Sequence, residues 1–426
     1  MPRESSSRSP MRCLWIARYI PYPADAGAKV YSAGMAESLA RAGASVRFMG
    51  FGNTDAIPSH AAHVEWISIP NGKRSEVAGL FSHLPVAAAI DATRSYAATI
   101  ERELRAPWDA IVFDGYATGW ALGPCLRHCQ WPGAPRPVLV HVSHNHEEQL
   151  WQTMAREANT SSARRFALWQ NYRKVRALER KLAGNVDLLS TITEEDRGSL
   201  GVALPDHRVL TLTPGYSGPT AAERTIDRHV PRRVIIVGSF RWIMKQENLV
   251  RFVELADPVF SANDIALDVV GDVPDELVAT LRKRSRATRF HGFVADVAPL
   301  LMQARLAVVP EAIGGGFKLK FLDYVFGRVP IATLARAVAG LPEELRRATL
   351  AREELPALVD AIVAHIDRLG ELNGMQERAL AAGRSAFCWD ERGRRLWQAI
   401  AHLRHECRAL QPAAASGEKL PAATST

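Results

Sequence analysis

The sequence has few cysteines and no long hydrophobic run, and each shortage excludes a class of protein. Its five cysteines among 426 residues are scattered and odd in number, which favours reduced thiols in a cytosol over a disulfide framework. The longest apolar runs have the length of a strand, whereas a membrane-spanning helix needs roughly 18 apolar residues. The polar first ten residues and the break at Arg18 argue against a secretory signal. We therefore expect a cytoplasmic protein that does not span a membrane.

The sequence also lacks a convincing set of metal ligands. Cys125, His128 and Cys129 are suitable residue types, but no second pair of ligands stands at the spacing that a zinc site uses. We therefore expect no bound metal.

Length and composition favour two domains. The 426 residues are 47% hydrophobic, enough for two domains of roughly 200 residues with a core each. The net charge of +8 is compatible with an anionic membrane surface, nucleic acid or an anionic substrate as partner. Because no groove-reading module is recognisable, we do not expect nucleic acid.

Much of the positive charge lies in residues 156–181, where apolar residues recur at helical spacing. Two interpretations stay open: a solvated helix face over a packed stripe, or a peripheral contact with anionic lipid or a lipid-linked acceptor at the inner face of a membrane. The apolar stripe consists of Phe166, Trp169, Tyr172, Val175, Leu178 and Leu182, and the basic residues largely off it are Arg164, Arg165, Arg173, Lys174, Arg176 and Arg180.

In the first half of the chain, short apolar strands alternate with helical patterns. A turn containing Gly27 and a helix through residues 30–39 separate the first two strands. This alternation is typical of a parallel α/β sheet, and we assign residues 11–214 to a first Rossmann-like domain. The strands are expected at Cys13 to Ala17, Ser45 to Met49, Ala110 to Asp114, Val138 to Val142 and Leu188 to Thr191.

The second half repeats the alternation after a connector. Residues 216–231 are rich in Gly, Pro, Thr and charge without an apolar period. We assign residues 232–385 to a second doubly wound domain, residues 386–408 to a final helix, and residues 1–10 and 411–426 to disordered tails. The strands are expected at Val234 to Val237, Ile265 to Val270, Phe290 to Phe293, Leu306 to Pro310 and Val329 to Ala332.

The most informative segment joins glycines to lysines. A strand runs into Gly314, Gly315 and Gly316, and a helix that opens with Lys318 and Lys320 follows. Glycines let the backbone approach a phosphate, and the helix N-terminus and the lysines supply positive charge. This pattern predicts an anion site; the alternative is a flexible loop before a structural helix.

A second segment of the same kind opens the second domain. Gly238 and Ser239 end a strand, and Arg241 and Lys245 follow. The backbone and hydroxyl can contact a phosphate, and either cation can neutralise a diphosphate. Both segments follow strands of one sheet, whose carboxyl ends are where open α/β sheets bind ligands.

Taken together, these segments resemble the glycosyltransferase family 4 group of GT-B enzymes over about residues 11–403. The resemblance implies an α/β GT-B fold, with two Rossmann-like domains facing a central cleft and a C-terminal helix that crosses back to the first domain. The motifs that carry it are Pro21-Tyr-Pro-Ala-Asp-Ala-Gly27, Ser143-His-Asn-His-Glu147, Ser190-Thr-Ile-Thr-Glu-Glu-Asp196, Pro214-Gly215, Val237-Gly-Ser239, Val269-Val-Gly-Asp272, His291-Gly-Phe-Val294 and the segment from Gly314 to Pro330.

The resemblance also implies roles for residues of the second domain. Asp323 stands where the family usually has the second glutamate of its Glu-x7-Glu motif, which grips the ribose of the donor. The first glutamate would fall at Gly315 and is absent. Related sequences with a Gly-Gly-Gly-Thr-Arg-Leu-Lys pattern are similar in lacking this glutamate, and Lys318 and Lys320 of this chain stand at the two basic positions of that pattern. Gly315 has no side chain with which to make the usual sugar contact.

Further roles are implied on either side of the cleft. The donor base is expected near Gly292, Phe293 and Val294. Gly27 of the first domain is expected to approach the diphosphate from the opposite side of the cleft; the alternative is that it serves only the turn in which it lies. His144 and His146 stand where the family often places a histidine near the transferred sugar. They orient the acceptor, act as a base, or are structural.

The implied activity is transfer of a sugar from a nucleotide diphosphate-sugar, with retention, to a glycan, a lipid-linked saccharide or a small molecule. The chain contains no Asp-x-Asp pair, so we expect metal-independent transfer with the nucleotide-sugar as co-substrate and no other cofactor. Two alternatives stay open: a nucleotide-sugar epimerase or hydrolase of the same fold, and a non-catalytic membrane-associated binding protein.

Overall fold

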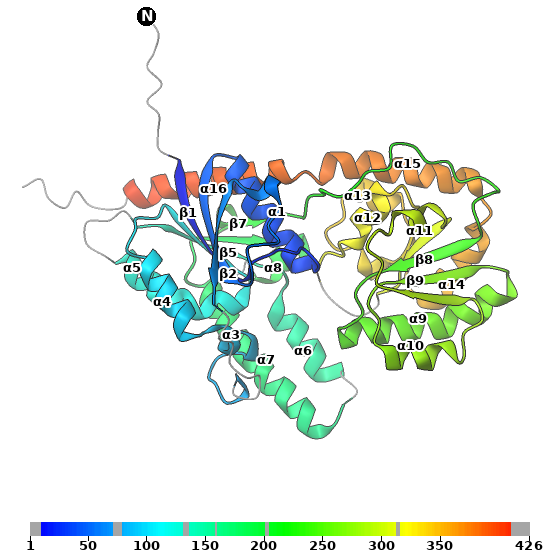
Figure 1. Cartoon of the computed structure of the whole chain (residues 1–426), viewed down its shortest axis with the longest axis horizontal. Helices are drawn as coiled ribbons and strands as arrows, with labels where there is room; N and C mark the ends of the chain where they lie inside the picture. The colour runs from blue at the N-terminus through cyan, green and yellow to red at the C-terminus, as the bar shows by residue number, and fades with distance from the viewer. Residues whose placement is uncertain are drawn as a thin grey trace, which may run out of the picture.

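The computed structural model describes residues 10–70, 79–130, 136–157, 160–200, 204–311 and 316–409, which form two lobes (Figure 1). The first lobe is built on a parallel sheet with the strand order β3-β2-β1-β4-β5-β6-β7. Its strands are β1 (Met11–Tyr19), β2 (Ala44–Phe51), β3 (Val64–Ile69), β4 (Ala110–Asp114), β5 (Val138–Val142), β6 (Leu188–Thr191) and β7 (Val209–Thr211).

Helices cover both faces of this sheet because successive side chains of its central strand alternate between two cores. Trp15 of β1 packs on one side with α1, and Leu14 packs on the other side with α4 and α5. The helices are α1 (Gly27–Arg41), α3 (Val86–Asp91), α4 (Arg94–Glu103), α5 (Leu122–Cys129), α6 (Glu147–Glu157), α7 (Ser162–Ala183) and α8 (Glu194–Leu200), with shorter 3-10 turns η1 (Ser59–Ala61), η2 (Tyr116–Ala121) and η4 (Asp206–Arg208).

The second lobe repeats the design with a parallel sheet in the order β10-β9-β8-β11-β12-β13. Its strands are β8 (Arg233–Val237), β9 (Ala266–Val270), β10 (Thr288–Gly292), β11 (Leu306–Val309), β12 (Ile331–Leu334) and β13 (Leu350–Arg352). Its helices are α9 (Ile243–Ala262), α10 (Asp275–Arg282), α11 (Ala298–Met302), α12 (Lys320–Phe326), α13 (Glu343–Arg347), α14 (Leu355–His365) and α15 (Leu369–Ala386), with the 3-10 turn η5 (Ala335–Ala337).

The last helix, α16 (Trp389–Ala409), returns to the first lobe and packs along α1 (Figure 1). Two glycines permit the close approach. A Cβ at Gly34 would lie 2.3 Å from the Trp389 ring, and a Cβ at Gly393 would lie 2.1 Å from the Ser38 carbonyl oxygen. The predicted fold, two Rossmann-like lobes with a helix crossing back, is confirmed.

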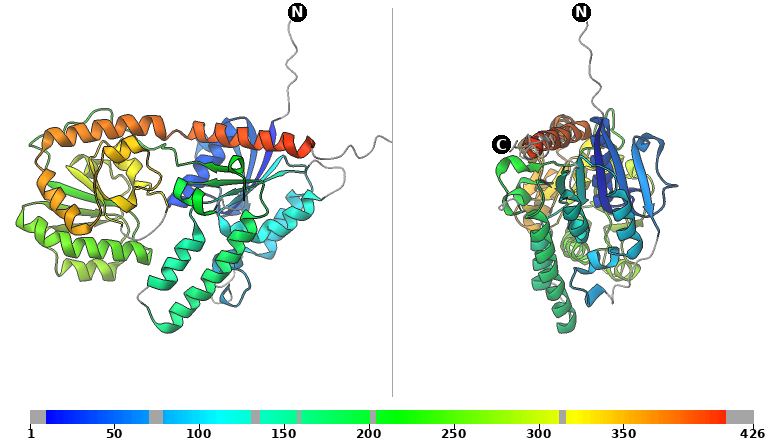
Figure 2. Two further views of the ribbon diagram at one scale, coloured as in Figure 1. Left: turned by 180° about the vertical axis from the view of Figure 1, so that it is seen from behind. Right: turned by 90° about the vertical axis from the view of Figure 1, so that its left-hand side faces the viewer.

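Two features of the described helices bear on the earlier expectations. None of them combines the length and the apolar character that crossing a bilayer requires. The basic stretch forms the end of α6 and most of α7, and Figure 2 shows these two helices projecting from the first lobe as a hairpin.

Candidate functional site

The two segments that sequence analysis singled out in the second domain do meet. Strand order reverses between β8 and β11, and ligands of such sheets bind at the carboxyl ends of the strands beside this point. Gly238 directly follows β8, and a Cβ added there would lie 3.3 Å from Lys320 Nζ. The Lys320 ammonium is also 5.8 Å from the centroid of the buried Phe240 ring. The missing side chain of Gly238 therefore leaves room for a lysine at the switch point.

Lys320 is not an isolated charge, because its ammonium forms an ion pair with Glu311 directly after β11. Both side chains are almost fully buried. Burial works to raise the pKa of Glu311, but the Lys320 charge outweighs it and the pKa is lowered. Within the described residues, Glu311 Oε2 is buried without a hydrogen-bond partner. Glu311 is not among the site residues expected from the sequence, where its signal is an acid at the end of an apolar strand.

Two more lysines surround this pair. Lys318 Nζ donates a 2.8 Å hydrogen bond to the Gly316 carbonyl. Burial, together with the charges of Lys320 and Lys245 against that of Glu311, lowers the pKa of Lys318 to about 8. Partial desolvation and the Lys320 charge also lower the pKa of Lys245. The three ammonium groups thus disfavour one another's charge, and this lysine cluster (Lys245, Lys318, Lys320) would be stabilised by an anion.

Arg241 and Ser239 are less closely held in the site. Arg241 forms an ion pair with Asp272, and its side chain is 79% exposed. Ser239 is exposed at the start of the same loop. Arg241 is therefore exposed and paired, and the buried cation beside Gly238 is Lys320 of α12.

Three glycines at the ends of β8, β9 and β10 bring the backbone of neighbouring strands together. A Cβ at Gly271 would lie only 1.8 Å from the Gly238 carbonyl oxygen, and the Gly271 N–H donates to the Gly292 carbonyl at 2.7 Å. After Gly292, which has a φ of +70°, the Phe293 side chain is 80% exposed, and Val294 packs partly against the second-lobe core. The segment predicted for the donor base thus presents an aromatic ring to solvent.

Asp323 lies on α12, one helical turn after Lys320, and is half-buried. Burial raises the pKa of Asp323 to about 6, against the lowering effect of Lys320. The other two predicted glycines, Gly314 and Gly315, lie outside the described residues.

The first lobe faces this site with a histidine held by a carboxylate. His144 Nε2 lies 2.5 Å from Asp114 Oδ1, and Trp15 Nε1 donates to Asp114 Oδ2 at 2.7 Å. Burial alone would lower the pKa of His144, but Asp114 outweighs it and the pKa is raised. Asp114 ends β4 and pairs in register with Val142 of β5, which brings it to His144. The Asp114 carboxylate is not among the site residues expected from the sequence.

His146 lies on the same loop but in different surroundings. Its Nδ1 is buried and has no hydrogen-bond partner within the described residues. The backbone N–H of His146 hydrogen-bonds to Asp196 and works to lower the pKa of that carboxyl, but burial outweighs it and the pKa is raised. The Asp196 carboxylate also accepts a 2.9 Å hydrogen bond from the Thr193 hydroxyl.

Buried carboxylates continue along the first lobe beside His144. Glu179 accepts the backbone N–H groups of Glu147 and Glu148 at 3.0 and 2.7 Å, which caps the start of α6. Burial raises the pKa of Glu179 to about 8 and also raises the pKa of Glu147. A protonated carboxyl group can donate a hydrogen bond to a sugar hydroxyl and can also accept one from it.

Close approaches between the lobes bring the two halves of the site together. A Cβ at Gly316, which has a φ of +71°, would lie 2.3 Å from Asn145 Oδ1. A Cβ at Gly27 would lie 3.2 Å from the Leu319 side chain. The predicted loops of the first lobe therefore meet the segment that carries Lys318 and Lys320.

A pocket of about 720 Å³ also lies between the lobes, but at the start of α16 rather than at the lysine cluster. Residues from both lobes line it, including Thr213, Gly340 and Arg346. As for metals, no group of three or more His, Cys, Asp or Glu in the described ranges is arranged to hold an ion.

Comparison with known proteins identifies the architecture. Residues 231–368 match the protein-family model described as Glycosyl transferases group 1. No curated protein matches the sequence. Among solved structures, sucrose-phosphate synthase from Thermosynechococcus elongatus is 18% identical with a TM-score of 0.67, over 93% of this chain and 100% of that one.

Two further solved structures have the same arrangement at low identity. HepE from Anabaena, in complex with UDP and glucose, is 12% identical with a TM-score of 0.63, over 92% of this chain and 100% of that one. WaaG, a glycosyltransferase involved in lipopolysaccharide biosynthesis, is 16% identical with a TM-score of 0.60, over 91% and 99%. The chain therefore has the GT-B glycosyltransferase fold, and its second lobe matches the glycosyl transferases group 1 family.

Proposed function

We propose that the chain is a glycosyltransferase that moves a sugar from a nucleoside diphosphate-sugar to an acceptor hydroxyl. The observation that carries this proposal is the lysine cluster with Glu311 at the switch point of the second sheet. A diphosphate is the anion that suits such a cluster, because burial and the charge of Lys320 lower the pKa values of both Lys245 and Lys318. HepE has been solved with UDP and with UDP-glucose, which favours a uridine diphosphate-sugar as the first donor to test.

Each part of the donor has a candidate partner. Lys318, Lys320 and Lys245 would hold the diphosphate, and the backbone at Gly238 and Gly316 would let it approach closely. The base would lie against residues 292–294. Asp323 would contact the ribose, as the family resemblance implies, although it is shorter than the usual glutamate.

The chemistry follows from the charge that develops. When the bond between the sugar and the phosphate breaks, the nucleoside diphosphate leaves with additional negative charge, and preorganised ammonium groups stabilise it. These lysines would perform the role without a metal. We propose retention of configuration, with the leaving phosphate accepting the proton of the acceptor.

His144 would position the acceptor. Asp114 raises the pKa of His144 and thereby favours the imidazolium, whose Nδ1–H then donates to an oxygen of the acceptor or of the departing phosphate. The acceptor itself would be a glycan, a lipid-linked saccharide or a small molecule, on the cytoplasmic side of a membrane. The carboxyl group of Glu147, which lies three residues after His144, is suited to its hydroxyls.

The test begins with donor choice. Thermal-shift measurements with UDP-, GDP-, ADP- and dTDP-sugars should show one nucleotide that raises the unfolding temperature, because a ligand that binds the native state stabilises it. Product analysis with that donor then separates the activities. Transfer of the sugar to an added acceptor with release of the nucleoside diphosphate supports the proposal. Hydrolysis without transfer to any acceptor would indicate a hydrolase, and a new nucleotide-sugar formed without acceptor would indicate an epimerase. If the protein neither binds nor turns over any of these donors, the proposal is contradicted.

A further inference from the structure

Exposed aromatic side chains gather on and beside the α6–α7 hairpin of the first lobe. Four of the seven large hydrophobic side chains that are exposed among the described residues lie there. Phe166 and Trp169 are on α7, 60% and 43% exposed, and Leu80 and Phe81 lie in the adjoining segment, 46% and 89% exposed. The ammonium of Lys174 joins the two groups, because it donates to the Leu80 carbonyl at 2.7 Å.

The structure divides the apolar stripe that the sequence predicts on this helix. Tyr172, Val175, Leu178 and Leu182 are buried against the first lobe, as the packed-stripe interpretation expects. Phe166, at the start of the stripe, does not join them and faces solvent beside Trp169, with their ring centroids 6.2 Å apart. Packing within this chain therefore explains only the second half of the stripe.

The basic residues divide in the same way. Arg176 and Arg180, over the buried half, both pair with Glu148 of α6. Around the exposed aromatics, Arg164, Arg165 and Arg173 are exposed and form no ion pair with any described carboxylate. The Arg173 guanidinium instead lies 5.0 Å from the centroid of the Trp169 ring. The hairpin thus presents unneutralised arginines around aromatic rings.

This combination fits one kind of partner. Trp and Phe rings lie favourably at the boundary between headgroups and acyl chains, while Arg and Lys side chains reach anionic headgroups. A second copy of the chain fits less well, because a symmetric contact would set the same arginines against each other. The hairpin projects on the side of the molecule away from α15 and α16, so a flat surface can reach it (Figures 1 and 2).

We infer that this surface, made of Leu80, Phe81, Phe166 and Trp169 with Arg164, Arg165 and Arg173, docks on an anionic lipid bilayer. The inference does not rest on the proposed sugar transfer, since it uses none of the residues of the lysine cluster. If transfer also holds, docking would keep the inter-lobe site beside a lipid-linked acceptor.

Flotation with vesicles tests the inference on the full chain. The protein should bind vesicles of phosphatidylcholine with about a third phosphatidylglycerol, and should not bind phosphatidylcholine alone. Raising the salt from about 0.1 M to about 1 M should release it, because the screening length falls from roughly 10 Å to roughly 3 Å. The variant F166S/W169S should lose at least about tenfold in partitioning. The variant R164A/R165A/R173A should lose about a hundredfold, at about fivefold for each arginine.

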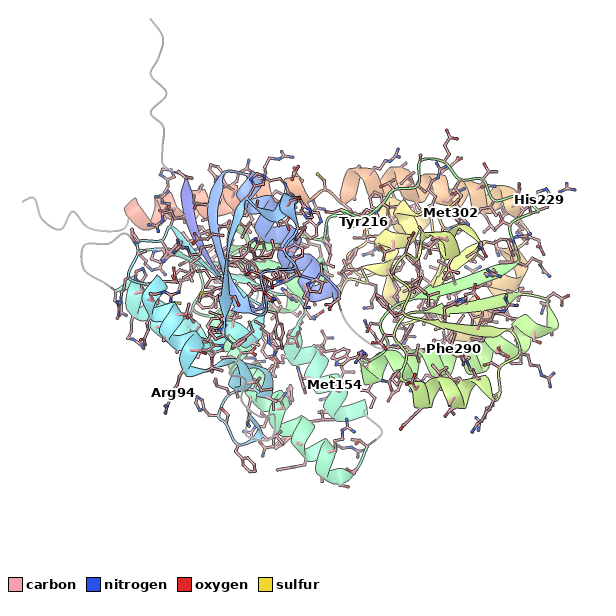
Figure 3. All side chains as sticks on the ribbon, viewed as in Figure 1. Arg94, Met154, Tyr216, His229, Phe290 and Met302 are labelled. Carbon is pink, nitrogen blue, oxygen red and sulfur yellow. The ribbon has the colours of Figure 1, made fainter. Side chains whose placement is uncertain are left out.

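Matched substitutions on the second lobe show whether the loss of any exposed apolar or basic side chain weakens vesicle binding. Met302, labelled in Figure 3, is an exposed apolar side chain there, and Arg284 is an exposed arginine. M302S and R284A should bind vesicles as the unaltered protein does, and all variants should keep its unfolding temperature and donor turnover. No binding to anionic vesicles, or equal binding by the hairpin variants, would overturn the inference. A dimer that F166S/W169S abolishes would assign the surface to a second copy instead, and would overturn it as well.

Discussion

The two lobes share one strand order but present different chemistry at the carboxyl ends of their strands. In both sheets, the order in which strands are added reverses beside the first strand, between β1 and β4 and between β8 and β11. The second lobe places Lys318 and Lys320 there, while the first lobe places Asp114 and His144. Cations suit a diphosphate, and a histidine held by a carboxylate suits a hydroxyl. One topology can therefore present different chemistry through the residues that end its strands.

Removing the charge of Lys320 should have the largest effect on donor turnover, because this charge belongs to the lysine cluster of the second lobe. K320M alone would leave Glu311 buried without its partner and cost about 3–5 kcal/mol in stability, so a loss of activity would be ambiguous. The double variant E311Q/K320M removes both charges and should fold. Its donor turnover should fall by at least about a hundredfold, since one electrostatic group on a leaving anion contributes about 2.7–4 kcal/mol. Release of nucleoside diphosphate measures this.

The matched control for that experiment is Arg241→Met. Arg241 is exposed and already paired with Asp272, so its removal should lower turnover less than about tenfold. Normal turnover by a folded E311Q/K320M protein would remove the lysine cluster from the mechanism.

Asp114→Asn tests the first lobe. Asparagine keeps an acceptor for Trp15, but it no longer holds the imidazolium of His144, so the pKa of His144 should fall. We expect turnover at neutral pH to drop by about ten- to a hundredfold, and the pH profile of kcat to shift toward lower pH. A structural role alone would lower the unfolding temperature without moving the profile, and that result would speak against His144 as the positioning residue.

The pH dependence of UDP binding sharpens the contrast between the lobes. Burial and neighbouring lysines lower the pKa of Lys318 to about 8, so Lys318 carries its charge at pH 7 and loses it as the pH rises through 8. UDP affinity should therefore decrease severalfold between pH 7 and pH 9, as titration calorimetry would measure. Lys318→Met should bind more weakly at pH 7 and lose most of this dependence. Equal slopes for both proteins would assign the titration to another group.

The sequence could predict the fold and which segments meet at the candidate site, because both follow from local patterns. Alternating strands and helices are enough for two parallel sheets, and the topology then brings Gly238 to Lys320. Glu311 and Asp114 could not be assigned in the same way. Their partners depend on which way each side chain points and on the register of β4 with β5, and only the folded chain fixes those. The sequence also could not show how much of the apolar stripe on α7 is packed. An aromatic residue has the same position in the helical period whether its ring is buried or exposed.

Phe293→Ala should give the smallest effect and separates base binding from diphosphate binding. The ring is 80% exposed, so its loss should leave the unfolding temperature unchanged. If a donor base stacks on it, the KM for the nucleotide-sugar should rise about fivefold, at the low end of the roughly 1–3 kcal/mol that stacking contributes, while kcat stays within about twofold. Met302→Ala, another exposed apolar residue of this lobe, should change neither constant. A lower kcat with unchanged KM would mean that residues 292–294 act on the transferred sugar rather than on the base.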